Sequence, residues 1–287
     1  MKEAKLYKKE GSNVRCIACA HKCIIPIDST GICGVRKNIE GKLYLLVYGK
    51  VVVKHVDPIE KKPLKHFLPG TSTFSIGTIG CNFHCSFCQN YDISQFKEFY
   101  GDKILGENIT PRQIITQAVR SKCKSIAYTY NEPSIFIEFV KDVSKLAKRK
   151  ELKNIMVTNG YLSSESFNFI KNYVDVMNID LKSFKDDFYK KHCQASLKHV
   201  LDTIKRVNKA GIHLEITTLV IPGENDSLEE LKQIPEFIAS VSNEIPWHVT
   251  RYFPQYKLQK PVTPIETLKQ ACEIGNKYLK YVYMGNV

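Results

Sequence analysis

From about residue 71 onward, hydrophobic and polar positions follow a repeating rhythm along the chain. Short runs of apolar and β-branched residues predict strands, and the longer stretches with helical spacing between them predict helices. The predicted strands are Thr73–Gly80, Ser125–Tyr130, Asn154–Thr158, Val174–Leu181, His213–Ile221, His248–Phe253 and Tyr281–Gly285. The predicted helices lie near residues 111–122, 134–149, 163–172, 197–210, 227–240 and 264–279. Strands that alternate with helices indicate βαβ units and a parallel sheet.

The number of these units predicts an α/β fold with a partial or complete (β/α) barrel of parallel strands. Catalytic groups of such a barrel lie at the carboxyl ends of its strands. Residues 1–70 break the rhythm, since they contain four cysteines, a β-like run at 42–55 and several turn-forming prolines. We therefore predict a small Cys-rich, metal-binding subdomain over residues 1–70 and the barrel core over 71–287.

Composition places the chain among packed globular proteins, because 43% of its residues are hydrophobic. The charged start, Met1-Lys2-Glu3, is followed by no apolar run, and no later stretch approaches the length of a membrane span. We therefore expect a cytoplasmic protein without a membrane partner. In that reducing compartment, ten cysteines indicate metal binding or catalysis and not a disulfide framework.

The charge balance is basic, with 42 Lys and Arg against 29 Asp and Glu and a formal net charge of +13. A positive surface favours anionic partners such as nucleic acid or an acidic protein surface, although a solvated basic exterior has the same composition. No basic run is interleaved with aromatic residues in the way typical of nucleic-acid-binding arms.

A loop with three cysteines follows the first predicted strand of the barrel. Its ligand pattern is C-x3-C-x2-C, formed by Cys81, Cys85 and Cys88. Three thiolates at this spacing can each bind one iron of a [4Fe–4S] cluster, which leaves the fourth iron open for a chelating substrate. A zinc site is the alternative, but it lacks a nearby fourth thiol, and His84 lies inside the loop.

The pattern C-x3-C-x-aromatic-C after the first strand of a β/α barrel resembles the radical S-adenosylmethionine (SAM) superfamily, with Phe87 as the aromatic residue. The resemblance implies that the amino and carboxylate groups of SAM chelate the open iron. It also implies reductive cleavage of SAM to methionine and a 5′-deoxyadenosyl radical, which abstracts hydrogen from a substrate.

The second predicted strand ends in Thr129-Tyr130-Asn131-Glu132-Pro133, which resembles the G-G-E-P motif that receives the SAM amino group. Tyr130 and Asn131 stand where that motif has glycines. Glu132 is suited to accept hydrogen bonds from an ammonium group, and Asn131 is the neighbouring candidate. The alternative role of Glu132 is a carboxylate at the start of the helix after Pro133.

Later strand ends supply the remaining candidate SAM contacts. Thr158-Asn159-Gly160 and Asp180-Leu181-Lys182 resemble the T-N-G and D-L-K segments of glycyl-radical-enzyme activases. Asn159 and Asp180 are candidates for ribose and methionine contacts, and Lys182 for a carboxylate contact. Three further candidates for binding SAM or substrate come from the last strands: Gly223, His248 and Arg251. For the last two, a core histidine and a surface arginine are the alternatives.

Four more cysteines lie close together near the amino terminus, at Cys16, Cys19, Cys23 and Cys33, with His21 as a possible substitute ligand. Four thiols complete either a tetrahedral zinc site or an auxiliary iron–sulfur cluster. We favour zinc, because a structural metal would stabilise a small segment that lacks its own core. The other thiols are isolated in sequence and are interpreted as buried apolar residues: Cys123, Cys193 and Cys272.

The run from Cys16 to Val287 resembles the radical SAM enzyme of the AmmeMemoRadiSam system, which is itself similar to pyruvate formate-lyase activating enzymes. The marks include Gly31-Ile32-Cys33-Gly34, Gln89-Asn90 and Ser94-Gln95. The resemblance implies an activase-like oxidoreductase that acts on a protein or peptide and receives electrons from a donor such as flavodoxin or ferredoxin. RNA modification, supported by the +13 charge, and an iron–sulfur electron carrier or redox sensor are the alternative functions.

Overall fold

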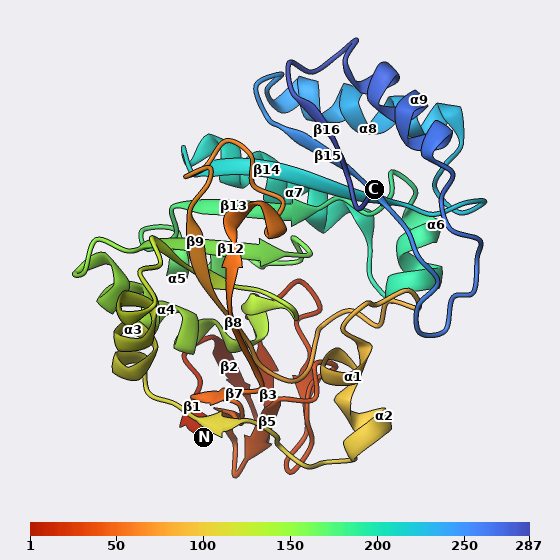
Figure 1. The fold of residues 1–287 in the computed structure, drawn as a ribbon. Coiled ribbons are helices and arrows are strands. Elements are labelled where there is room, and N and C mark those ends of the chain that lie inside the picture. The colour runs from red at the N-terminus through yellow and green to blue at the C-terminus, as the bar shows by residue number, and fades with distance from the viewer.

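An eight-stranded sheet organises the computed structural model, which describes all 287 residues (Figure 1). Its strands run in the order β16 (Val282–Gly285), β15 (Trp247–Arg251), β14 (His213–Val220), β13 (Val176–Asp180), β12 (Lys153–Thr158), β11 (Ser125–Tyr128), β9 (Ser72–Gly77) and β8 (Val53–Pro58). All neighbouring pairs from β9 to β16 are parallel. The predicted α/β fold is confirmed, and the barrel is partial, since β8 and β16 form the two open edges.

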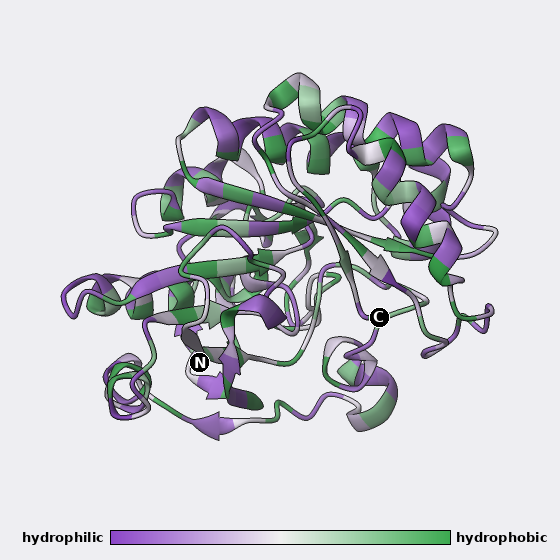
Figure 2. Ribbon diagram, turned by 45° about the horizontal axis from the view of Figure 1, so that its top comes forward, coloured by the Kyte–Doolittle hydropathy of each residue, from purple (hydrophilic) through white to green (hydrophobic).

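Helices connect the parallel strands and pack against the sheet. They are α3 (Pro111–Arg120), η2 (Pro133–Phe136) with α4 (Ile137–Lys148), α5 (Ser164–Ile170), α6 (Asp186–Phe188) with the π-helical turn η3 (Tyr189–Cys193), α7 (Leu197–Lys209), α8 (Leu228–Val241) and α9 (Ile265–Gly275). Figure 2 shows hydrophobic and hydrophilic stretches alternating along these helices, as expected when one face of each is buried. None of the helices combines the length and the apolar character that crossing a bilayer requires.

The sequence supplies clear start signals for several of these helices. The Thr110 side chain accepts a hydrogen bond from the Gln113 backbone, and the Gln113 side chain accepts one from the Thr110 backbone. Ser163 and Ser227 each accept a hydrogen bond from the third residue beyond them. Each cap satisfies a backbone donor that the first turn of a helix leaves without an intrahelical partner.

The amino-terminal region forms small antiparallel sheets beside the barrel (Figure 1). One contains β1 (Lys2–Glu3), β6 (Lys42–Leu45) and β5 (Arg36–Ile39), and another contains β2 (Tyr7–Glu10), β3 (Asn13–Cys16) and β4 (Ile24–Ile25). The short β7 (Lys50–Val51) pairs with β10 (Glu107–Asn108), and η1 (Ile59–Lys61), α1 (Tyr91–Ser94) and α2 (Phe96–Tyr100) complete the fold. The boundary predicted at residue 70 does not fall between sheets, because β8, which precedes it, pairs antiparallel with β9, which follows it.

A single hydrophobic cluster runs from the amino-terminal strands to the last helices, and it contains Val14, Leu43, Ile76 and Trp247. The amino-terminal region and the barrel therefore share one core. The segment after β8 enters the barrel, where Ile59 and Leu64 pack against strand residues in a second, smaller cluster.

A buried ion pair also joins the two regions. Arg36 on β5 donates to both carboxylate oxygens of Glu138 on α4, at 3.2 and 2.5 Å, and to the backbone oxygen of Ile135 at 2.8 Å. The side chains of Arg36 and Glu138 are 2% and 3% exposed. Burial alone would raise the pKa of the Glu138 carboxyl, but the charge and hydrogen bonds of Arg36 lower it instead.

Candidate active site

A cavity of about 430 Å³ opens at the carboxyl ends of the parallel strands. Its volume lies in the range of sites for cofactor-sized ligands, roughly 300–1,000 Å³. Nine of the residues predicted from sequence line it: Cys81, Cys85, Phe87, Cys88, Asn131, Glu132, Asn159, Asp180 and Lys182. The parallel sheet brings them together because β9 and β11 to β16 all deliver their carboxyl ends to the same side.

The loop after β9 is held in place by side chains from neighbouring elements. Asn131 donates from Nδ2 to the Thr78 hydroxyl at 3.0 Å and to the Gly80 carbonyl at 2.8 Å. Gln95 donates to the carbonyl of Phe83 at 2.9 Å. These contacts fix the loop before and after Cys81, so the three thiols project from a constrained backbone.

The three thiols of this loop differ in exposure, since Cys85 is buried while Cys81 and Cys88 are half-buried. Burial raises the pKa of the Cys88 thiol to about 11, and it raises the pKa of Cys81 well above the usual range. Buried thiols do not ionise alone, whereas metal coordination deprotonates them outright. The hydrogen bond with Cys193 lowers the pKa of the Cys85 thiol instead. Three thiols that line one cavity fit the ligand set of a [4Fe–4S] cluster that keeps one iron free of protein ligands.

Glu132 follows β11 and caps η2. It is 2% exposed, and its carboxylate accepts hydrogen bonds from the Ser134 backbone at 2.9 Å, the Thr158 hydroxyl at 2.9 Å and the Asn159 backbone at 2.8 Å. Burial raises the pKa of this carboxyl. The helix-capping contact expected as the alternative is therefore present, and the same carboxylate also lines the cavity.

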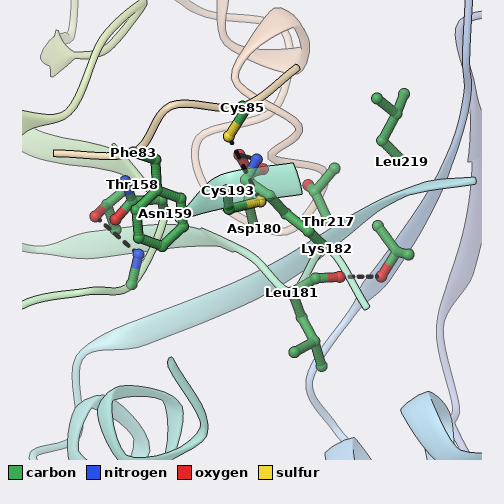
Figure 3. A network of polar contacts seen from close by, with 12 residues as sticks. Phe83, Cys85, Thr158, Asn159, Asp180, Leu181, Lys182, Cys193, Thr217 and Leu219 are labelled. Atoms are coloured by element: carbon green, nitrogen blue, oxygen red, sulfur yellow. Dashed lines mark hydrogen bonds and ion pairs between the residues drawn. The ribbon is translucent and has the colours of Figure 1, made fainter. Parts of the chain in front are cut away.

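Asp180 and Lys182 extend from the end of β13 toward the thiol loop. Lys182 Nζ lies 2.8 Å from Asp180 Oδ2 and 5.7 Å from the centre of the Phe87 ring. Figure 3 shows Cys85 pointing toward this pair and toward Cys193. The Cys85 and Cys193 sulfurs are 3.7 Å apart, so Cys193 is buried as predicted but is not isolated.

The site geometry agrees with the comparisons to known proteins. The model of the radical SAM superfamily matches residues 75–237, more than half of the chain. The chain belongs to the radical SAM superfamily. Members of this superfamily use a [4Fe–4S] cluster and SAM as cofactors, so both predicted cofactors are confirmed at the level of the family.

Relatives of this radical SAM protein cover most of its length. An uncharacterized protein of Methanocaldococcus jannaschii is 45% identical over 100% of this chain and 86% of its own. The pyruvate formate-lyase-activating enzyme of Clostridium pasteurianum is 23% identical over 70% of this chain and 87% of its own. The crystal structure of Streptococcus suis SuiB bound to precursor peptide SuiA matches with a TM-score of 0.58 and 13% identity, over 80% of this chain and 51% of SuiB.

Three residues predicted from sequence do not line the cavity of this radical SAM protein. His248 lies near the start of β15 and contacts the Glu215 carboxylate at 2.6 Å. Arg251 donates to the Thr263 carbonyl at 2.8 Å, and Gly223 lies on an exposed turn. The strand pattern predicts β15, but it does not predict which of its side chains reach the cavity. The β15 residue at the cavity wall is Thr250.

Sequence reasoning missed a second group of cavity residues, which comes from the segment after β8. Lys61 and Lys62 line the cavity, and Lys62 Nζ lies 2.8 Å from Asp57 and 4.6 Å from the centre of the Tyr130 ring. Tyr130 donates to Asp57 at 2.7 Å. Burial opposes ionisation of Asp57, but these hydrogen bonds lower its pKa to about 2. The only signal in the sequence is a Lys pair before Pro63.

Proposed function

We propose that this protein cleaves SAM reductively at a [4Fe–4S] cluster bound by Cys81, Cys85 and Cys88, and that the 5′-deoxyadenosyl radical abstracts hydrogen from a protein or peptide. The observation that carries the proposal is the convergence of these thiols with polar groups from successive strand ends on one cavity of about 430 Å³. A simple electron carrier needs no cavity of this size beside its cluster, so the arrangement favours catalysis.

A [4Fe–4S] cluster held by Cys81, Cys85 and Cys88 would supply one electron for cleavage of the carbon–sulfur bond of SAM, which gives methionine and the radical. The protein's own residues orient SAM for that step. Glu132 accepts hydrogen bonds from the SAM ammonium, and Lys182 attracts its carboxylate. Asn159 and Asp180 have acceptor oxygens suited to the ribose hydroxyls.

A protein or peptide substrate is supported by the relatives. One is named an activating enzyme of pyruvate formate-lyase, and a structural neighbour was crystallised with a precursor peptide. The radical takes a hydrogen atom from the substrate, which becomes a radical, and is released as 5′-deoxyadenosine. A low-potential one-electron donor, such as flavodoxin or ferredoxin, supplies the electron.

Anaerobic reconstitution with iron, sulfide, a chemical reductant and SAM tests the chemistry. We expect 5′-deoxyadenosine and methionine in equal amounts, and neither product when the reductant is omitted. A fully loaded cluster that leaves SAM intact would contradict the proposal. When lysate proteins are added to the reconstituted enzyme, we expect a protein substrate to become cross-linked or to lose a hydrogen atom from one of its carbons. RNA that co-purifies with the enzyme and binds it in a salt-sensitive way would instead favour the RNA-modifying alternative.

Replacing Glu132 by Gln is expected to raise the dissociation constant of SAM. A charge-assisted hydrogen bond contributes about 1.5–3 kcal/mol, and 1.4 kcal/mol corresponds to about tenfold in affinity, so we expect an increase of about tenfold. Isothermal titration of the cluster-loaded variant measures this change, and its iron content should equal that of the unmodified protein.

Ser227→Ala is the matched control for the Glu132 variant, because it removes a helix cap at α8, away from the cavity. It should destabilise the start of α8 and leave SAM affinity unchanged. If Glu132→Gln also leaves SAM affinity unchanged, the carboxylate serves only as a cap. The ammonium contact would then pass to Asn131.

A further inference from the structure

Cys193 is a buried thiol that the proposed chemistry does not use. It is the last residue of the π-helical turn η3 and is fully buried. Its sulfur lies 3.7 Å from that of Cys85, and Figure 3 shows the Cys85 side chain pointing toward it. An apolar core thiol, as interpreted from the sequence, needs no sulfur partner. The contact therefore gives Cys193 a possible chemistry that its burial alone does not.

The backbone holds these two thiols against each other. The amide of His84 donates to the carbonyl of Cys193 at 3.0 Å. The amide of Ser86 donates to the carbonyl of His192, also at 3.0 Å. The two hydrogen bonds come from the residues on either side of Cys85, so they fix its backbone beside the end of η3. A third link joins the side chains, since Ser86 Oγ lies 2.9 Å from His192 Nδ1.

A disulfide between the two thiols needs only a small movement. A sulfur–sulfur bond is about 2.05 Å long, so sulfurs that start 3.7 Å apart must approach by about 1.7 Å. Rotation of the two side chains about their Cα–Cβ bonds moves the sulfurs, and the paired backbones of the loop and of η3 stay in place. The pair is therefore positioned for a disulfide without refolding of either segment.

The two thiols differ in their access to small molecules. Cys85 lines the cavity of about 430 Å³, whereas Cys193 is absent from its wall. A small oxidant that enters the cavity therefore meets the Cys85 sulfur first, with the Cys193 sulfur directly behind it. An accessible thiol next to a second, shielded one is the arrangement in which an oxidised cysteine is resolved as a disulfide.

We propose that Cys85 and Cys193 form an oxidation site, in which hydrogen peroxide converts the two thiols to a disulfide when Cys85 holds no iron. The Cys85 sulfur attacks a peroxide oxygen, the oxygen–oxygen bond breaks, and the sulfur becomes a sulfenic acid with loss of one water. The Cys193 sulfur then attacks the Cys85 sulfur, the sulfur–oxygen bond breaks, and a second water leaves. Two thiols and one peroxide thus give one disulfide and two water molecules.

The disulfide has two consequences for the thiol loop. It engages one of the three sulfurs that the catalytic cluster requires, so the loop cannot bind a cluster until the bond is reduced. It also stops the oxidation of Cys85 at a reversible stage, because a sulfenic acid without a partner thiol is oxidised further to sulfinic acid, which a dithiol does not reduce. The first consequence rests on the proposed function, whereas the disulfide itself does not.

One equivalent of hydrogen peroxide, added to the full chain before cluster reconstitution, tests the disulfide. Alkylation of the remaining thiols, proteolysis and mass spectrometry should locate one disulfide, between the peptides of Cys85 and Cys193, and dithiothreitol should remove it. The Cys81→Ser/Cys88→Ser variant leaves Cys85 as the only thiol of its loop and should form the same disulfide. A disulfide from Cys193 to Cys81 or Cys88, or a Cys193 that is still a thiol after Cys85 has been oxidised, overturns the proposal.

Cys193→Ser tests the protection of Cys85. After peroxide and then dithiothreitol, the unmodified chain should regain its untreated iron content on reconstitution. Cys193→Ser should instead carry Cys85 as sulfinic or sulfonic acid and lose the iron of one cluster. Cys272→Ser removes a cysteine of α9, away from the cavity, and is the matched control that should recover fully. Equal recovery of Cys193→Ser and the unmodified chain overturns the protective role.

Iron uptake by the oxidised chain separates this proposal from the proposed function. Before dithiothreitol is added, the chain with the Cys85–Cys193 disulfide should take up less iron than the untreated chain, by the content of one cluster. Undiminished uptake would overturn the block on cluster binding and show that Cys85 is not a cluster ligand. That result would contradict the proposed function and leave the disulfide itself established.

Discussion

Replacing Cys81, Cys85 or Cys88 by Ala is expected to abolish reductive cleavage of SAM. Each cysteine is proposed to hold one iron of the catalytic cluster, and two thiolates do not retain a cluster that needs three. The barrel should stay folded, because these residues lie on a loop at the cavity wall and the strands bury their own core. Formation of 5′-deoxyadenosine under reducing conditions measures the loss, and circular dichroism checks the fold.

The neighbouring thiol of Cys193 makes this experiment sharper. Its sulfur lies 3.7 Å from that of Cys85, so it is the one cysteine placed to substitute for a missing ligand. Cys193→Ala is therefore the matched control, and we expect it to keep both the cluster and SAM cleavage. If Cys85→Ala keeps full SAM cleavage and Cys193→Ala loses it, Cys193 and not Cys85 is the third ligand of the cluster.

Much of this site could be predicted because a parallel sheet places consecutive strand ends on one side. The positions of Glu132, Asn159 and Asp180 follow from the strand pattern, since each lies within two residues of the end of a predicted strand. The thiol loop follows the first strand of the series in the same way. Local patterns were sufficient here because the geometry that joins these residues is a property of the fold.

Other contacts could not be predicted, because they depend on how distant segments pack. Lys61 and Lys62 enter the cavity only because β8 pairs with β9 and the chain then turns into the barrel. The sequence marks His248 as a polar residue of β15, but it does not tell which end of the strand lies beside the cavity. The pairing of Glu215 with His248 becomes visible only when β14 and β15 are aligned in register.

The buried ion pair between Arg36 and Glu138 is expected to dominate the attachment of the amino-terminal strands to the barrel. Glu138→Gln leaves the Arg36 guanidinium buried without its counter-charge, and breaking a buried pair in this way costs about 3–5 kcal/mol. The midpoint of urea unfolding, compared at equal cluster content, measures the loss. Glu273→Gln is the control, since Glu273 is exposed on α9 and should change stability little.

The same pair predicts how stability depends on pH. The pKa of Glu138 is lowered in the folded protein, so its contribution is complete above its unfolded pKa of about 4.3 and is lost as the pH falls through the lower folded value. The stability difference between the unmodified protein and Glu138→Gln should therefore shrink on acidification below about 4.3. A double variant, Arg36→Met with Glu138→Leu, removes both charges and should recover much of the stability lost in Glu138→Gln. A double variant no more stable than Glu138→Gln would show that the loss comes from packing at α4 and not from the uncompensated guanidinium.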